Sequence, residues 1–236
     1  MKKIMWAISF ISLAGTAVVL QFLPDTVPMH YDMAGNIDRW GSKYENLIFP
    51  LILLAMSLLW TLLIRYYEKK ADKAPYEKER TDARTNIKVL SIVGVATAAM
   101  FTVMQGFILY GAYSGAVSEA EKQTVDIGKV SCILLGILFI VLGNFMTKTR
   151  INSTIGLRVS WSMYSENTWR KSNRFAAYAI IAAGIVTILL AVFIKNSFAA
   201  TMMSLGALLL ACIAALIYAH KVYVKEIEAG GVKSKE

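Results

Sequence analysis

One short polar segment, "VPMHYDMAGNIDRWGSK" (residues 27–43), brings together His30, Asp32 and Asp38. Side chains of these types can bind a metal ion or transfer protons. The segment has no cysteine, no second histidine and no HExxH motif, and the other histidine of the chain, His220, is remote in sequence. We therefore favour an ordered loop held by side-chain hydrogen bonds, with no catalytic residue, metal or cofactor. A hydrolase that uses His30 with Asp32 or Asp38 is the alternative.

A second patterned segment, between residues 147 and 174, is rich in positive charge. Its basic residues are Lys148, Arg150, Arg158, Arg170, Lys171 and Arg174, against the single acid Glu166. Such a segment can bind anionic lipid headgroups or dock an acidic or phosphate-bearing partner, and composition does not separate the two. Ser165 is expected to cap a short helix that begins near Glu166, and Trp161 and Trp169 are expected at the membrane interface.

The elements that must position both segments are membrane-spanning helices. Hydrophobic residues make up 56% of the 236 residues and charged residues 17%, and about 20 apolar residues suffice to cross the hydrocarbon. Six runs qualify: 4–23, 47–65, 89–113, 127–146, 175–194 and 200–219. We predict an all-α polytopic protein with one membrane domain over 1–236, an outer loop at 24–46 and an inner loop at 147–174. The first run is interpreted as a retained helix rather than a cleaved signal peptide.

The distribution of positive charge predicts the orientation of the helices. If the N-terminus is cytoplasmic, 20 of the 25 Lys and Arg residues lie inside and only Arg39, Lys43, Lys122, Lys129 and Lys195 lie outside. Because basic residues are retained on the cytoplasmic side, both termini are predicted to be cytoplasmic. The net charge of +9 is then explained by topology and anionic lipid, and no direct nucleic-acid partner is expected.

Few polar residues interrupt the spans. Gln105 is expected to form an interhelical hydrogen bond, and Cys132 and Cys212 to be buried and unpaired. No chain of buried acids or bases appears, which weighs against a proton pump or ion-coupled transporter. Close helix packing is predicted from alanines spaced by four at 207–219 and from the GxxxG of Gly111 and Gly115.

The two patterned segments share the pattern G-x4-W-x4-E-N at an offset of 121 residues. Gly35, Trp40, Glu45 and Asn46 form it in the first segment, and Gly156, Trp161, Glu166 and Asn167 in the second. A true repeat would give two halves of three helices in opposite orientation, as in inverted-repeat transporters. A chance match is the alternative.

The two motifs together resemble the SdpI-type toxin-immunity family. "LPDTVPMHYDMAGNIDRWGSK" is similar to its extracytoplasmic pattern and "GNFMTKTRINSTIGLRVSWSMYSENTW" to its second pattern. The resemblance implies a multi-pass bacterial cell-membrane protein that protects against a secreted membrane-active peptide toxin. The best-known member also holds a small transcriptional repressor at the membrane. The chain departs from the family pattern at Thr147, Ser160 and Asn173, which we expect to loosen the inner loop.

Most site residues follow from the matching positions, and Asp32 and Arg150 are added because of their charge. Toxin or ligand contacts are predicted for His30, Tyr31, Asp32, Gly35, Asp38, Trp40 and Lys43. Contacts with an inner partner are predicted for Asn144, Lys148, Arg150, Asn152, Gly156, Arg158, Trp161, Glu166 and Trp169. The alternative to an immunity and signalling protein is a small transporter or flippase for a peptide or lipid, with the hydrolase third.

Overall fold

The computed structural model describes residues 1–118, 121–152 and 154–233. It contains six long helices, each long and apolar enough to cross a membrane. They are α1 (Lys2–Val19), α2 (Ile48–Asp72), α3 (Glu77–Val117), α4 (Ile127–Met146), α5 (Glu166–Phe193) and α6 (Ser197–Lys233). The prediction of a six-helix, multi-pass membrane protein is confirmed. The bounds of α4 agree with the predicted span, whereas α3, α5 and α6 continue well beyond theirs.

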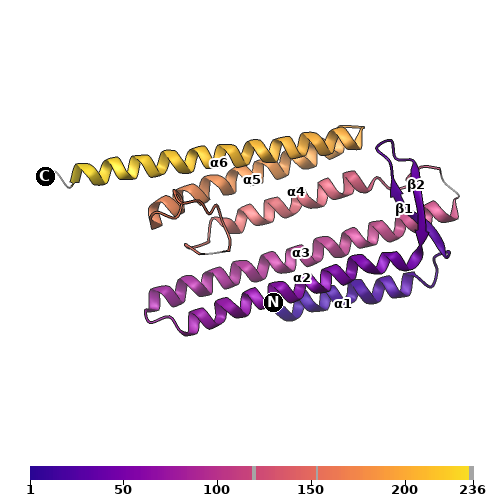
Figure 1. Ribbon diagram of the computed structural model, residues 1–236, viewed down its shortest axis with the longest axis horizontal. Coiled ribbons are helices and arrows are strands. Elements are labelled where there is room, and N and C mark those ends of the chain that lie inside the picture. Colours follow the sequence, from indigo (N-terminus) through magenta and orange to yellow (C-terminus); the bar gives the residue numbers. More distant parts are fainter. Residues whose placement is uncertain (119–120, 153, 234–236) are drawn as a thin grey trace.

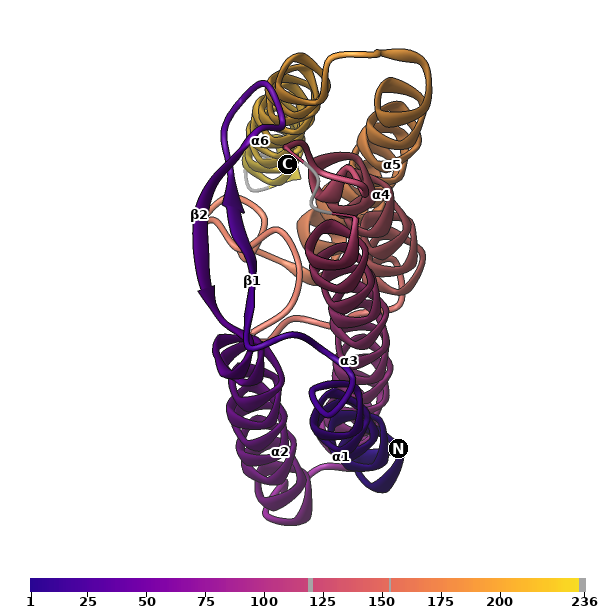
Figure 2. The same ribbon diagram turned by 90° about the vertical axis from the view of Figure 1, so that its right-hand side faces the viewer.

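The helices form two groups of three that follow the chain order (Figures 1 and 2). In the first half, α3 packs against both α1 and α2, which also touch each other; in the second, α5 lies between α4 and α6. Contact between α3 and α4 joins the halves. The division agrees with three helices per half. The packing order within the halves differs, so the internal repeat stays a prediction.

The segment predicted as the outer loop contains regular structure. Strands β1 (Thr26–Tyr31) and β2 (Ile37–Ser42) form an antiparallel hairpin, and the 3-10 helix η1 (Lys43–Leu47) leads into α2. Helix α1 ends at Val19, four residues before the predicted end of its span, and turns precede Pro24. A capping box starts η1: Tyr44 N–H donates to the Ser42 hydroxyl, and Ser42 N–H donates to the Glu45 carboxylate.

The hairpin crosses one end of the bundle, from beside α2 in the first half toward α6 in the second (Figure 2). We call this the hairpin end; residues 121–126 and 194–196 also lie there (Figure 1). The opposite end, here the loop end, carries the α2–α3 connection at 73–76 and the segment 147–165. The two patterned segments therefore lie at opposite ends of the molecule.

Glycines allow α4 and α5 to approach backbone to backbone. A methyl group on Gly136 would lie 2.7 Å from the Gly184 carbonyl oxygen, and one on Gly143 would lie 2.7 Å from that of Ala177. These backbone contacts, together with the side chains of Ile181 and Ile188 on α5, cover the glycine face of α4. On α6, which packs mainly against α5, Ala215 and Ala219 are buried, as close helix packing requires.

The GxxxG motif of Gly111 and Gly115 does not pack against another helix as predicted. A methyl group on Gly115 would lie 3.0 Å from the Pro28 ring of the hairpin, and one on Gly111 would lie 3.7 Å from Val125. The motif therefore accommodates the hairpin and the α3–α4 connection, and its use for helix–helix packing was wrongly predicted. Spacing alone identifies a small-residue face but does not identify what packs against it.

Gln105 ties the first half together near the hairpin end. Its side chain is 2% exposed, and its amide donates to the Thr16 hydroxyl at 3.1 Å and to the Asn46 carbonyl oxygen at 3.0 Å. The predicted interhelical hydrogen bond is confirmed, and α1, α3 and η1 meet at this residue.

Candidate binding surfaces at the two ends of the bundle

Asp32 and Gly35 build the turn of the hairpin. One Asp32 carboxylate oxygen accepts the backbone N–H groups of Ala34 and Asn36 at 2.8 Å, and the other accepts the Asn36 amide at 2.7 Å. These hydrogen bonds, led by that of the Asn36 side chain, hold the pKa of Asp32 below its ordinary value. Gly35 has φ of +81°, a conformation that costs little only for glycine. Both residues serve the turn, and their predicted ligand contacts stay a prediction.

His30 and Asp38 face each other across the hairpin. The His30 Nδ1 and the Asp38 carboxylate oxygen are 2.6 Å apart, on side chains that are 65% and 44% exposed. A β-bulge at His30 shifts the register so that Arg39 stands opposite it. The pair can exchange a proton with a ligand, since a carboxylate orients the imidazole. Within the described residues, no hydrogen bond joins this pair to a nucleophilic hydroxyl or thiol.

The aromatic residues of the hairpin differ in exposure. Trp40 is 45% exposed, whereas Tyr31 is half-buried and burial raises the pKa of its phenol. Met33, next to the turn, is 76% exposed. Trp40 and Met33 therefore offer apolar area at the surface of this end, and Met33 was not among the predicted site residues.

Lys43 is mostly used within the fold. Its ammonium lies 3.1 Å from the Asp25 carboxylate and donates to the Leu23 carbonyl oxygen at 3.2 Å, and its side chain is 14% exposed. The contacts join the end of α1 to the start of η1. The matching of Lys43 to the family motif has this structural explanation, and its contact with a ligand stays a prediction.

The tip of the hairpin is fastened to the α3–α4 connection, which the sequence did not predict. Gln123 N–H donates to the Gly35 carbonyl oxygen at 2.7 Å, and Ile37 N–H donates to that of Glu121 at 2.9 Å. A methyl group on Gly35 would lie 2.8 Å from the Gln123 amide nitrogen. The hairpin thus spans both halves and is held at each end.

A cavity of about 430 Å³ lies beneath the hairpin, between the two halves. The first half contributes residues 28–33, Asn46 and Ile108, and the second contributes Asp126 with the starts of α4 and α6. Asp126 links those two helices, because one of its carboxylate oxygens accepts Lys129 N–H at 3.0 Å and the Ser197 hydroxyl at 2.7 Å. The cavity combines hairpin residues with residues that no motif marked.

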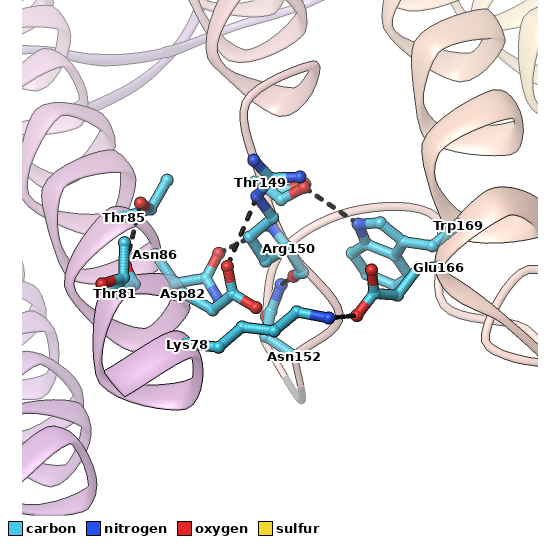
Figure 3. Close-up of polar contacts among 10 residues, drawn as sticks. All are labelled: Lys78, Thr81, Asp82, Thr85, Asn86, Thr149, Arg150, Asn152, Glu166 and Trp169. Carbon is cyan, nitrogen blue, oxygen red and sulfur yellow. Dashed lines mark hydrogen bonds and ion pairs between the residues drawn. The ribbon is translucent and has the colours of Figure 1, made fainter. Parts of the chain in front are cut away.

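At the loop end, residues 147–165 fold onto the first half (Figure 3). Arg150 N–H donates to the Asn86 side-chain oxygen on α3 at 3.0 Å, and the Arg150 guanidinium lies 3.5 Å from the Asp82 carboxylate. Lys78 on α3 pairs with Glu166 at the start of α5, 2.5 Å away. Two of the nine predicted partner-binding residues, Arg150 and Glu166, therefore contact the first half of the chain.

Buried polar groups fix the conformation of this segment. Asn152 is 8% exposed, and its side-chain oxygen accepts Thr154 N–H and Ile155 N–H, each at 2.7 Å. Gly156 has φ of +112° and lies against Asn173 and Trp169. Asn173 is 2% exposed and accepts Leu157 N–H at 2.7 Å. The prediction that Asn173 loosens the loop is wrong, because the Asn173 side-chain amide holds the loop at Leu157.

The tryptophans of this segment do not share one environment. Trp169 is 2% exposed, and its indole N–H donates to the Thr149 carbonyl oxygen at 3.0 Å. The protein therefore encloses this indole, and its position at the membrane interface stays a prediction. Trp161 is half-buried, with its ring centroid 4.8 Å from that of His220 on α6. The buried partner for the Trp169 indole is a tertiary contact that spacing in the sequence does not reveal.

The helix cap predicted for this segment is confirmed. Thr168 N–H donates to the Ser165 hydroxyl at 3.0 Å, and α5 begins at Glu166. The helix is not short, however, but runs on without a break to Phe193. Residues 166–174 thus belong to α5, and the non-helical part of the predicted inner loop ends at Ser165.

Three predicted partner-binding residues remain free at the surface. Asn144, Lys148 and Arg158 are exposed, and the Lys148 ammonium lies 4.9 Å from the Phe145 ring centroid. No three His, Cys, Asp or Glu side chains within the described residues are placed to hold a metal ion. Cys132 is buried and Cys212 is exposed, so the predicted burial of Cys212 is wrong; both are free thiols.

Comparisons with known proteins match both patterned segments. The SdpI/YfhL protein family matches residues 148–219, and a domain of unknown function, DUF1648, matches residues 7–54. The chain is 30% identical to the immunity protein SdpI of Bacillus subtilis (strain 168) over 195 residues, which is 82% of this chain and 83% of that protein. No solved structure matches. The chain belongs to the SdpI/YfhL family.

Proposed function

We propose that this protein is a membrane immunity protein that protects a bacterial cell against a secreted, membrane-active peptide toxin. The observation that carries the proposal is the 30% identity to an immunity protein over 82% of the chain. Six membrane-spanning helices agree with an activity exerted in the bilayer. The two segments that match family models are also the two that cross between the halves of the bundle, at opposite ends.

The hairpin end is the proposed outer face. The loop end carries the N-terminus, residues 65–88, residues 148–174 and the C-terminus, which together hold 20 of the 25 Lys and Arg residues. Retention of positive charge favours a cytoplasmic location for that end. Both termini are then cytoplasmic, and a toxin arriving from outside meets the hairpin first.

The exposed hairpin side chains are the proposed toxin contacts. Trp40 and Met33 supply apolar area, and His30 with Asp38 supplies a polar pair that solvent reaches. Aromatic side chains commonly dominate the energy of such contacts. Asp32 and Gly35 support this surface by shaping the turn, and Lys43 fastens the end of the hairpin to Leu23 and Asp25, in the segment between α1 and β1.

Relay of toxin binding to a cytoplasmic repressor is the proposed second activity. Asn144, Lys148 and Arg158 are exposed at the loop end and form its proposed docking surface, together with Trp161. Such a relay requires that the toxin binds two states of the bundle with different affinity. An acidic or phosphate-bearing surface on the partner would complement the exposed basic residues.

Survival of a toxin-sensitive strain tests the immunity activity. Cells that lack their own immunity gene would express this chain and be exposed to the toxin to which the immunity protein SdpI confers resistance, and to a panel of other secreted peptide toxins. We expect survival to rise for at least one toxin. Trp40→Ala should reduce that protection, whereas Phe22→Ala, an exposed apolar residue outside the hairpin, should not. Equal killing with and without the chain across the panel would rule the proposal out.

A transporter or flippase is the second candidate, favoured by the cavity between the halves. Within the described residues, no buried side chain is charged, which argues against ion coupling. A proteoliposome assay decides between the candidates. Movement of a labelled peptide or lipid across the bilayer would support transport, and its absence alongside protection in cells would support immunity.

A further inference from the structure

The cavity beneath the hairpin has a lining of unusual charge for this basic protein. Two carboxylates, Asp32 and Asp126, line it together with His30, which pairs with Asp38, and no Lys or Arg is among the described lining residues. Lys122 of the α3–α4 connection and Lys129 of α4 do not line the cavity. The lining therefore favours a positively charged occupant over an anionic one.

Asn46 offers an unused hydrogen-bond acceptor in this cavity. The residue lines the cavity and is only 3% exposed. Its amide nitrogen donates to the Lys43 carbonyl oxygen at 3.1 Å, whereas its side-chain oxygen accepts no hydrogen bond from any described residue. Because Asn46 lines the cavity, this oxygen is an acceptor that an N–H donor on a ligand can reach.

The remaining wall is apolar and adaptable. Met29, Met33, Ile108, Ile127 and Phe198 surround the polar groups. Methionine side chains adjust to irregular shapes, and an aliphatic stem would contact this wall while an ammonium group reaches the carboxylates and the amide oxygen. The cavity of about 430 Å³ falls within the range of small-ligand sites.

We propose that this cavity binds a primary ammonium group on an apolar stem, supplied by a lysine side chain or the N-terminus of a peptide. The inference rests on the proposed function, because it assigns to the peptide toxin a cationic anchor in the protein. Occupancy would bridge the hairpin of the first half and the Asp126 region of the second. The cavity therefore binds a positively charged group of the peptide, while the exposed hairpin residues contact its apolar side chains.

Photo-crosslinking with two matched probes tests the inference without any toxin. The full-length chain in phosphatidylcholine nanodiscs would be irradiated with acetyl-Lys-benzoylphenylalanine-amide or with the same compound carrying norleucine in place of lysine. We expect the lysine probe to label residues 28–33, 126–128 or 197–201, about tenfold more than the norleucine probe, as a charged hydrogen bond predicts. Equal labelling by both probes, or labelling confined to other segments, would overturn the proposal.

Substitutions separate the site from the fold. Asp126→Asn removes the charge but keeps an oxygen that caps α4, and Asn46→Leu removes the unused acceptor. Both should lower labelling about tenfold, whereas Asp25→Asn, a carboxylate that is 96% exposed at the same end, should not. Melting temperatures identify any variant that fails to fold. If Asn46→Leu fails to fold, the labelling of Asp126→Asn decides the test. Undiminished labelling of a folded Asp126→Asn variant would refute the assignment.

A lipid is the competing source of an ammonium group. Nanodiscs that contain phosphatidylethanolamine would compete with the lysine probe if the cavity takes a lipid headgroup, and such competition would overturn the peptide assignment. Unchanged labelling in those nanodiscs supports it. Loss of probe binding in this experiment and loss of protection in the survival assay are independent results, so failure of the inference is distinct from failure of the immunity proposal.

Discussion

At the scale of single residues, the patterned segments contain two kinds of side chain that the sequence does not tell apart. Asp32, Lys43, Asn152 and Trp169 are engaged in turns, caps and tertiary hydrogen bonds. Trp40 remains at the surface. A motif shows that a residue type is suited to its position. The residue can be needed there for a buried hydrogen bond as well as for a ligand contact. Exposure therefore decides which motif residues are candidates for binding.

Asp32 makes the hairpin turn sensitive to acid. Because its pKa is lowered in the folded chain, the turn is stabilised at pH values above the unfolded pKa of about 3.9. That stabilisation is lost as the pH falls through the lower folded value. Hydrogen-exchange protection factors of Ala34 and Asn36 should therefore drop as the pH is lowered below about 4. In Asp32→Asn this drop should be absent; a drop that persists in the variant would contradict the assignment.

At the scale of elements, apolar length predicted the six helices and turn chemistry predicted the turn at Gly35. The strands that flank the turn were missed, because each has six residues and the bulge at His30 disrupts their alternation. The partners of the small residues were also missed. Gly111 and Gly115 fit the hairpin and the connection, whereas the closest helix–helix approach uses Gly136, Gly143 and Gly184.

The glycine contact between α4 and α5 should be intolerant of one added methyl group. In Gly136→Ala the new carbon would meet the Gly184 carbonyl oxygen at 2.7 Å, which backbone movement alone relieves. We expect a loss of about 1–3 kcal/mol in the free energy of unfolding, measured in mild detergent. Gly106→Ala on α3 is the matched control, because no atom lies within 4 Å of its new carbon and alanine favours helix. Equal stability of the two variants would show that the contact between α4 and α5 tolerates the added methyl group.

At the scale of the whole molecule, both patterned segments make contacts with distant parts of the chain. The hairpin of the first half is fastened to residues 121–123 of the connection between the halves, and the segment that precedes α5 is fastened to α3 of the first half. The sequence predicted both segments and their opposite sides but not these contacts, since they join residues far apart in the chain. The internal repeat stays a prediction.

The contacts at the loop end should contribute very different amounts to the stability of the fold. Asn86 is 3% exposed and accepts Arg150 N–H in a part-buried hydrogen bond, so Asn86→Ala should cost about 0.5–1.5 kcal/mol by removing that bond. Lys78 and Glu166 are each 69% exposed, and solvent screens such pairs. Lys78→Ala should therefore leave the melting temperature unchanged. The opposite order of effects would show that charge pairing, and not the buried amide, joins the halves.

Accessibility of engineered cysteines tests the orientation. In a Cys132→Ser, Cys212→Ser background, Met33→Cys and Arg158→Cys place a thiol at exposed positions on the two ends. A membrane-impermeant maleimide added to intact cells should label position 33 and not position 158; permeabilised cells should label both. Labelling of position 158 in intact cells would reverse the proposed topology.

The length of α3 has a mechanical consequence. Its 41 residues extend about 60 Å, twice the hydrocarbon thickness of about 30 Å. Near one terminus Gly115 lies against the Pro28 ring, and near the other Asn86 holds Arg150. Gly115 and Asn86 are about 44 Å apart along the helix, so a rigid tilt of about 3° around the Gly115 end displaces Asn86 by about 2 Å. One continuous helix thus contacts both segments, so a displacement of the hairpin that tilts α3 would also move the site where Arg150 docks.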